Sequence, residues 1–131
     1  MSEAYKYSDI TRQIIGCAME VHKFLGNGFQ EVIYQRALAY EFVQAGLYFQ
    51  REIEQPIYYK DCNQPIGERR ADFIVENCVL VEIKAVIQLE EVHWAQILNY
   101  LKAYRFEVGL LINFGAKSLE WKRFVRSGEK V

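Results

Sequence analysis

The sequence lacks several features that would assign the protein to a class at once. Sixteen lysines and arginines stand against seventeen aspartates and glutamates, which gives a net charge of -1. No overall field attracts a polyanion, so nucleic-acid binding would have to depend on a local basic patch. No stretch reaches the roughly 18 apolar residues of a membrane span, and the N-terminus has no apolar signal region. We expect a cytoplasmic protein with no membrane partner.

Cysteine is also sparse, and its spacing argues against a zinc site. Cys17, Cys62 and Cys78 form no C-x-x-C pair and no cysteine-histidine spacing typical of zinc. An odd number of cysteines suits reduced thiols better than a disulfide framework. Repeats, low-complexity segments and linkers are missing too, so residues 1–131 are expected to form one domain around a single core.

Two helical patterns occupy the first third of the chain. From Ser8, apolar residues recur at intervals of three and four, which predicts an amphipathic helix with Ser8 as N-cap and Gly26 as its stop. A glycine-rich turn then leads into a second helix, from about Gln30 to Ala45. Gly46 is placed to end that second helix in a left-handed conformation.

Five strands and one more helix are predicted after these two helices. Alternation with a period of two indicates three strands, and a return to helical spacing is followed by a short apolar run and a final edge strand. The predicted bounds are strands over 48–60, 68–76 and 78–84, a helix over 89–104, and strands over 108–114 and 119–127. This order predicts an α/β domain with a mixed sheet flanked by helices.

Three charges interrupt the most strand-like stretch, residues 71–85. A loop centred on Asn77 would pair Asp72 with Glu82 across the two strands and place Lys84 on the same face. A two-residue turn would instead send the two acids to opposite faces. The other face would then be core, filled by Phe73, Val75, Val79, Val81 and Ile83.

Two interpretations of these charges remain open on the residues alone. Two adjacent carboxylates can bind an oxygen-seeking cation such as Mg²⁺, and a neighbouring lysine can then assist phosphodiester hydrolysis. An Asp, Glu and Lys on one strand face can equally be a solvated surface with a cross-strand ion pair.

The spacing of these charges resembles a known nuclease signature. Asp72 is followed, after nine residues, by the tripeptide Glu82-Ile83-Lys84, which is similar to the motif of the PD-(D/E)xK nuclease superfamily. Ala71 stands where that motif has proline. The resemblance implies a restriction-endonuclease-like core and metal-dependent hydrolysis of nucleic acid, with DNA favoured over RNA.

A second motif points to a narrower group. The segment GFQEVIY, residues 28–34, fits the pattern that names the GxxExxY protein family, and similarity to that family extends over roughly residues 10–126. The resemblance implies that Asp72 and Glu82 bind the metal, expected to be Mg²⁺ with Mn²⁺ as an alternative, and that Lys84 is the catalytic lysine. Glu31 matches a helix glutamate directed at the site and is expected to act in catalysis and metal binding. A carboxylate in the first turn of a helix is also favoured by the helix dipole alone.

Further residues are expected to contact the substrate. Gln96 and Tyr100 resemble the Q-x-x-x-Y element of RecB-type nucleases, whose residues contact the substrate backbone or support the site. Taken alone, a Gln and a Tyr at this spacing are ordinary helix surface. Arg70, beside Asp72, is placed to meet a phosphate. Tyr34 could equally be core or substrate contact.

Rival interpretations keep the same fold but change its use. A non-catalytic module could use the groove to bind nucleic acid or a partner protein, although clustered acids gain nothing obvious by facing a polyanion. The high aromatic content, 15%, also indicates a homodimer, since it exceeds what one small core needs.

Overall fold

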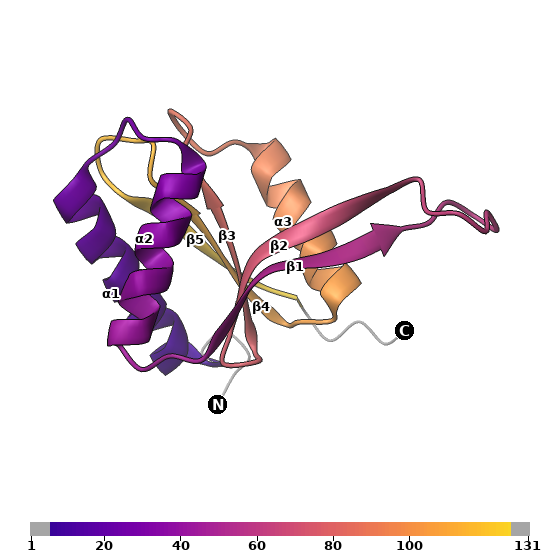
Figure 1. Ribbon diagram of the computed structural model, residues 1–131, viewed down its shortest axis with the longest axis horizontal. Helices are drawn as coiled ribbons and strands as arrows, with labels where there is room; N and C mark the ends of the chain where they lie inside the picture. The colour runs from indigo at the N-terminus through magenta and orange to yellow at the C-terminus, as the bar shows by residue number, and fades with distance from the viewer. Residues whose placement is uncertain (1–5, 127–131) are drawn as a thin grey trace.

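The computed structural model describes residues 6–126. Within this range the chain forms three helices and five strands in the predicted order (Figure 1). The helices are α1 (Ser8–Leu25), α2 (Glu31–Gln44) and α3 (Glu91–Tyr104). The strands are β1 (Phe49–Ile57), β2 (Gly67–Val75), β3 (Val79–Lys84), β4 (Val108–Asn113) and β5 (Glu120–Val125).

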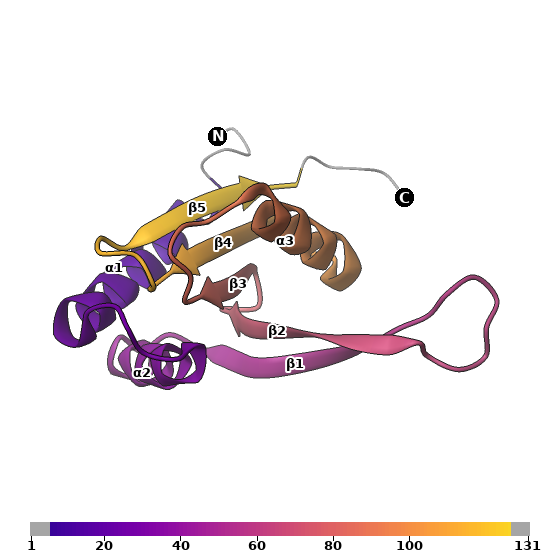
Figure 2. The ribbon, with the colours of Figure 1, turned by 90° about the horizontal axis from the view of Figure 1, so that it is seen from above.

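The five strands form one mixed sheet in the order β1-β2-β3-β4-β5. Only β3 and β4 run parallel, and the other neighbours are antiparallel. Parallel neighbours need a crossover connection, and α3 provides it. Figure 2 shows α1 and α2 on one face of the sheet and α3 on the other. The predicted mixed sheet with flanking helices is therefore confirmed.

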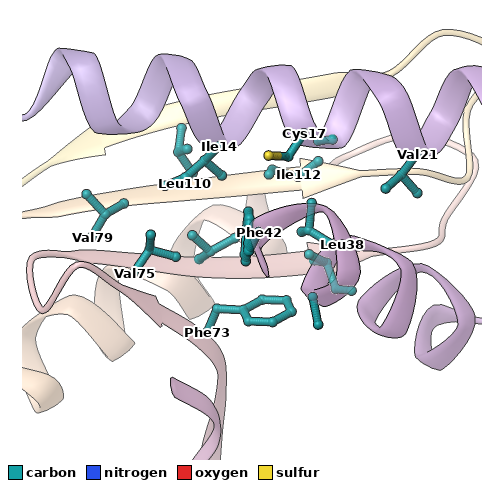
Figure 3. Packing of buried hydrophobic residues seen from close by; sticks show 14 of the residues in the cluster. Ile14, Cys17, Val21, Leu38, Phe42, Phe73, Val75, Val79, Leu110 and Ile112 are labelled. Atoms are coloured by element: carbon teal, nitrogen blue, oxygen red, sulfur yellow. The ribbon is translucent and has the colours of Figure 1, made fainter. Parts of the chain in front are cut away.

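The larger core lies between the sheet and the first two helices (Figure 3). It includes a cluster of phenylalanines, in which Phe42 of α2 meets Phe73 of β2 edge to face with 5.1 Å between ring centroids. A smaller core lies under α3, where Ile97 and Leu101 pack on Leu111. Because β4 is covered on both faces, every residue in it is buried, as its uninterrupted apolar run predicted.

The two glycines predicted to end the first two helices, Gly26 and Gly46, do so, but Ser8 is not the N-cap that was predicted for α1. Gly26 and Gly46 have φ angles of 70° and 72°, the left-handed conformation that glycine adopts without strain. Tyr7, not Ser8, is the N-cap of α1, and the carbonyl oxygen of Ser8 accepts a hydrogen bond from Thr11.

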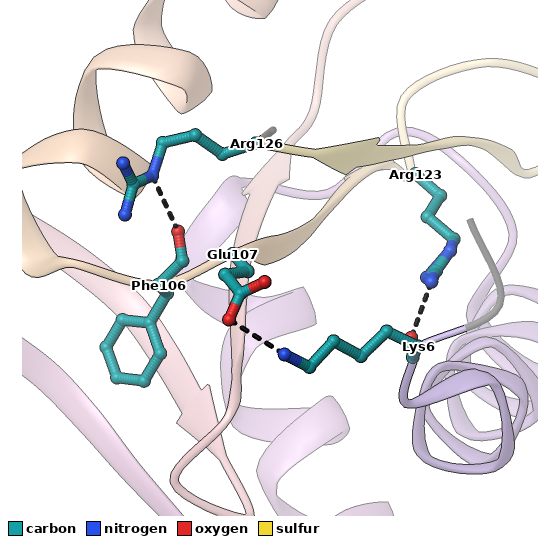
Figure 4. Close-up of polar contacts among 5 residues, drawn as sticks. All are labelled: Lys6, Phe106, Glu107, Arg123 and Arg126. Atoms are coloured by element: carbon teal, nitrogen blue, oxygen red, sulfur yellow. Dashed lines mark hydrogen bonds and ion pairs between the residues drawn. The ribbon is translucent and has the colours of Figure 1, made fainter. Parts of the chain in front are cut away.

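The position of the preceding residue explains why α1 begins one residue early. The main-chain oxygen of Lys6 accepts a hydrogen bond from Arg123, and its ammonium group pairs with Glu107 at 2.8 Å (Figure 4). The chain therefore leaves the edge of the sheet at Lys6, and Tyr7 makes the turn into the helix in a left-handed conformation.

Strand β1 ends earlier than predicted, at Ile57, and the last predicted strand extends to Ser127, which lies outside the described residues. Beyond the end of β3, β1 and β2 continue as a long two-stranded hairpin, residues 53–71, called here the arm (Figure 2). Its base is held to α3 by Tyr104, whose hydroxyl donates to the carbonyl oxygen of Ile53. No helix within residues 6–126 has the length and apolar content needed to cross a membrane.

Candidate active site

The register of the β2–β3 hairpin is the one predicted around Asn77. Val75 pairs with Val79 and Phe73 pairs with Val81, which leaves a three-residue loop over 76–78. Both Glu76 and Asn77 adopt positive φ angles, of 53° and 57°, to close that loop. The residues predicted to form the opposite face, Phe73, Val75, Val79, Val81 and Ile83, all belong to the larger core.

Strand β2 is irregular at Asp72: both its main-chain pairing and the alternation of its side chains are interrupted there. The β1–β2 ladder pairs the residues on both sides of this position but omits Asp72 and its counterpart Glu52, and the β2–β3 pairing ends at Phe73. Glu52 has a φ of 53°, which an L-residue in a regular strand does not adopt. Ala71 packs in the core under α3 whereas Phe73 packs in the larger core, although alternation would place them on one face. The main chain of Asp72 is therefore left out of both ladders, and its carboxylate accepts hydrogen bonds from neighbouring segments.

The Asp72 carboxylate is held from both sides. Its Oδ2 accepts a hydrogen bond from the main-chain N–H of Ile83 at 2.8 Å, and its Oδ1 accepts one from Nε2 of Gln35 at 3.2 Å. Gln35 is 6% exposed, and its own oxygen accepts a hydrogen bond from Nη2 of Arg51 at 2.9 Å. The roles of Gln35 and Arg51 were not predicted from the sequence. A signal was present, because Gln35 lies one helical turn after Glu31.

Glu82 is the most buried acid of the site, with 4% of its surface exposed. Burial raises its pKa well above the ordinary range, the charge of Asp72 and a hydrogen bond with Asp72 raise it further, and the charge of Lys84 opposes the shift. Its Oε1 has no hydrogen-bond partner within the described part of the chain. A buried polar atom without a partner costs roughly 1–3 kcal/mol, and more when it is charged. A cation at this position would relieve that cost.

Glu31 reaches the same region from the first turn of α2. Together with Gln35, Arg70 and Asp72 it lines a cavity of about 200 Å³. Burial raises the pKa of Glu31, the charge of Asp72 raises it further, and the charge of Lys84 lowers it. Glu31 therefore lies close enough to Asp72 and to Lys84 to respond to both of their charges.

Asp72 and Glu82 offer two oxygen ligands for a divalent cation, but not a complete ligand set. Hard cations such as Mg²⁺ take oxygen ligands and keep several waters, so two neighbouring carboxylates are a sufficient protein contribution. Asp72 and Glu82 provide that pair, and the unpartnered Oε1 of Glu82 is a free ligand atom. Within residues 6–126, no three acidic, histidine or cysteine side chains form a ready-made metal cluster.

Of the three residues expected to contact substrate, Tyr100 lies close enough to the acids to respond to their charge. Burial raises its pKa, and the charge of Glu82 raises it further. Gln96 lies one turn earlier on α3 and is half-buried. Arg70 lines the cavity and lies 4.0 Å from Glu52 in an exposed ion pair.

Other motif residues have structural roles. Tyr34 is fully buried, donates a hydrogen bond to the carbonyl oxygen of Gly26 at 2.7 Å, and stacks on Phe114 with 4.8 Å between ring centroids. Core packing is therefore the correct one of its two interpretations. Nε2 of His22, in the last turn of α1, lies 2.9 Å from the carbonyl oxygen of Ala116, within hydrogen-bond distance.

Asn113, at the end of β4, is a third polar residue whose role was not predicted from the sequence. It is fully buried and lies opposite Lys84 in the parallel register. Its Oδ1 accepts from the main-chain N–H groups of Val86 and Gly115, and its Nδ2 donates to the carbonyl oxygen of Val86 and to Glu120. These bonds fix the chain just after Lys84. A lone asparagine in an otherwise apolar run was the available signal.

Comparison with known proteins agrees with this fold. A family model of the PD-(D/E)XK nuclease superfamily matches residues 8–124, and the chain belongs to that superfamily. The solved crystal structure of SSO0001 is 16% identical with a TM-score of 0.59, over 97% of this chain and 62% of that chain. At this identity the similarity shows the fold alone. The search of curated proteins found no match.

Proposed function

We propose that the protein is a metal-dependent nuclease whose centre consists of Asp72, Glu82 and Lys84. The observation that supports this most is the buried Glu82 carboxyl, which lies against Asp72 with one oxygen unpartnered among the described residues. A solvated strand face, the alternative on the sequence alone, does not fit a glutamate that is 4% exposed. The superfamily to which the chain belongs supplies the class of reaction.

Each residue has a distinct part in the proposed reaction. Asp72 and Glu82 would hold Mg²⁺, or Mn²⁺ in its place, with Glu31 completing the set directly or through water. When bound, such a cation lowers the pKa of a bound water and polarises the phosphate. The Lys84 ammonium orients the attacking water and stabilises the charge that develops on the phosphate. Gln35 keeps the Asp72 carboxylate in position.

The proposed substrate contacts lie around this centre. Arg70 would meet a phosphate from within the cavity, and Tyr100 and Gln96 would contact the substrate backbone from α3. We propose DNA over RNA on the resemblance alone, so the test must include both.

A cleavage assay on labelled single- and double-stranded DNA and RNA tests the proposal. We expect cleavage with Mg²⁺ or Mn²⁺, none with EDTA, and none with Asp72→Asn. Asp61→Asn, at the exposed tip of the arm, is the matched control and should cleave normally. Binding without cleavage in any metal would instead identify a non-catalytic nucleic-acid-binding module.

We also propose that the chain belongs to the GxxExxY group, because each motif residue has a separate task. Gly28 has a φ of 109°, which glycine tolerates best, and it allows the turn before α2. Glu31 lines the cavity of about 200 Å³ beside Asp72, which we propose as the catalytic cavity, and Tyr34 anchors the turn through Gly26.

A homodimer is proposed from apolar side chains exposed on α1 and α2. Phe24 and Tyr40 are 86% and 62% exposed, and both line an apolar cavity of about 410 Å³ between the two helices. Patches of this kind mark interaction surfaces. Sedimentation should show a dimer at tens of micromolar, and a monomer there would refute it.

Two further expectations remain proposals. The cysteines Cys17, Cys62 and Cys78 are free thiols, which supports a cytoplasmic location. We further propose that residues 1–131 are one domain, because all three helices within residues 6–126 pack on the same sheet.

A further inference from the structure

A third cavity, of about 560 Å³ and called here the basic cavity, lies between the base of the arm and the C-terminal half of α3. Four cationic residues line it: Arg69 of β2, Lys102 of α3, Arg105 just after α3, and Arg126 just after β5. The other lining residues, Asn99 and Ala103, are neutral, so no acid from residues 6–126 lines this cavity. Residues far apart in the sequence thus build a concentrated positive charge in a chain whose net charge is -1.

Neighbouring groups hold two of these guanidinium groups without neutralising them. Nη1 of Arg69 donates to Oε1 of Gln55 at 2.8 Å, while its Nε is buried and has no partner within residues 6–126. Nε of Arg126 donates to the carbonyl oxygen of Phe106 at 3.2 Å, and Figure 4 shows its two terminal nitrogens directed away from that bond. None of the four cations forms an ion pair in the part of the chain that the structure describes. Their mutual repulsion favours an anionic ligand.

Gln55 also fixes the wall of this cavity. Its Nε2 donates to the carbonyl oxygen of Ala103 at 3.1 Å, while its Oε1 accepts from Arg69. The arm and the end of α3 are thereby joined across the base of the cavity, and the side chain of Arg69 is oriented before any ligand binds. Planar, pre-oriented guanidinium groups suit phosphate oxygens.

The basic cavity lies on the α3 side of the β1–β2 arm. Arg69 lines it, whereas the next residue, Arg70, lines the catalytic cavity from the other side of the strand, because successive strand residues point to opposite faces. The phenol of Tyr100 lies close enough to respond to the charges of both Glu82 and Arg69, and the next residue back on α3, Asn99, lines the basic cavity. A ligand that reaches the acids and passes Tyr100 would therefore arrive at the four cations.

The charged residues lining the catalytic cavity are mainly acids, whereas the basic cavity is lined by cations, so the two could bind different parts of one ligand. Glu31, Glu52 and Asp72 line the catalytic cavity with Arg70 as its one cation, so this wall repels a polyanion in the absence of metal. A nuclease of this charge needs phosphate contacts elsewhere. We propose that the basic cavity binds backbone phosphates of the nucleic acid strand that is cleaved at Asp72 and Glu82. This inference rests on the proposed nuclease function.

Anisotropy titration of a labelled DNA strand in EDTA, at several salt concentrations, measures this contact without cleavage. The test variant combines Lys102→Gln with Arg105→Asn; both residues are exposed, and asparagine tolerates the φ of 63° at position 105. The control combines Arg12→Gln with Lys23→Gln, which removes the same charge from exposed positions on α1.

The test variant should bind the strand at least about 10-fold more weakly at 0.15 M salt, with a log-log salt slope shallower by about 1.4, or ~0.7 for each lost phosphate contact. The control should stay within about two-fold of the unmodified protein, because its charges lie outside both cavities. Inorganic phosphate, titrated as a competitor, should displace the strand only weakly, since it offers a single contact.

The outcomes separate this inference from the proposed function. Equal affinity and equal slope in the test and control variants would overturn the inference, while metal-dependent cleavage by the unmodified protein would still support the nuclease. The inference would also be overturned if the test variant bound inorganic phosphate more weakly than the unmodified protein but bound the DNA strand equally well. If the unmodified protein neither binds nor cleaves any strand, both proposals fail. Thermal unfolding of each variant verifies that the fold is retained.

Discussion

Gln35 donates a hydrogen bond to Asp72 across the boundary between α2 and β2, at 3.2 Å. The same amide accepts a hydrogen bond from Arg51 of β1, so a buried glutamine joins a cation to a proposed metal ligand. Such outer contacts orient the groups that bind a metal.

Replacing Gln35 should weaken metal binding without unfolding the protein. Gln35→Met keeps the length of the side chain but removes the donor to Asp72, and we expect Mn²⁺ affinity and cleavage rate to fall roughly 10-fold or more. Calorimetric titration measures the affinity. Gln44→Met, at the exposed end of α2, is the control and should change neither. Unchanged affinity in Gln35→Met would mean that the N–H of Ile83 alone positions Asp72.

Removing either proposed metal ligand should have a larger effect. Asp72→Asn and Glu82→Gln each replace a charged ligand by a neutral amide, so calorimetry should show Mg²⁺ or Mn²⁺ binding weakened about 100-fold or lost. Glu91→Gln, in the exposed first turn of α3, should bind as the unmodified protein does. Normal binding in both ligand variants would refute the site.

The raised pKa of Glu82 should make the metal-free protein less stable as pH rises. A carboxyl whose pKa is raised by folding holds its proton in the folded state over a pH range where the unfolded chain has lost it. The free energy of unfolding should therefore fall from about pH 4.3 upward to the folded pKa, by at most about 1.4 kcal/mol per pH unit. Urea unfolding between pH 4 and 8 measures this slope.

In Glu82→Gln the part of this slope that belongs to Glu82 should disappear, because glutamine does not titrate. Glu31, whose pKa is also raised, should leave a smaller residual slope. An identical pH dependence in the unmodified protein and Glu82→Gln would show that Glu82 titrates normally.

Lys84 should affect the chemical step rather than metal binding. Lys84→Ala removes the positive charge near the attacking water, so the single-turnover cleavage rate should fall by orders of magnitude. Metal affinity should stay equal or rise slightly, because a repelling cation is gone. Lys122→Ala, on β5, controls for loss of surface charge. Cleavage at the normal rate by Lys84→Ala would favour the binding module.

Gly115 should tolerate no side chain. A Cβ at this position would lie 2.4 Å from the main-chain nitrogen of Val86, and backbone cannot yield as a flexible side chain does. Gly115→Ala should therefore lower the free energy of unfolding by about 1–3 kcal/mol and shift the chain that follows Lys84. Gly67→Ala meets no atom within 4 Å and is the matched control. Denaturant unfolding of both variants decides the matter.

The parts of the fold that were predictable depend on local patterns. Periodicity located every helix and strand within residues 6–126, because amphipathic elements bury one face. The hairpin around Asn77 set its own register, since a three-residue loop fixes which residues face each other. That register predicted Asp72 and Glu82 as a cross-strand pair, but the pairing ends at Phe73, and the Asp72 carboxylate instead accepts a hydrogen bond from the main-chain N–H of Ile83.

The parts that were not predictable depend on contacts between distant segments. Gln35, Arg51 and Asn113 gain their roles only when α2, β1 and β4 are in place. The four cations of the basic cavity come from three elements whose relative positions no periodicity specifies. Tyr7 replaced Ser8 as the cap because the sheet edge holds the preceding residue.

The tip of the arm divides the chain in a way that engineering can use. A break near Cys62 would fall in an exposed turn that lies outside both cores. The first fragment would contain Glu31 and Gln35, and the second would contain Asp72, Glu82 and Lys84. Neither fragment holds a complete centre, so phosphodiester cleavage by the mixed halves would act as a reporter of their reassembly, a split enzyme whose two parts meet along β1 and β2.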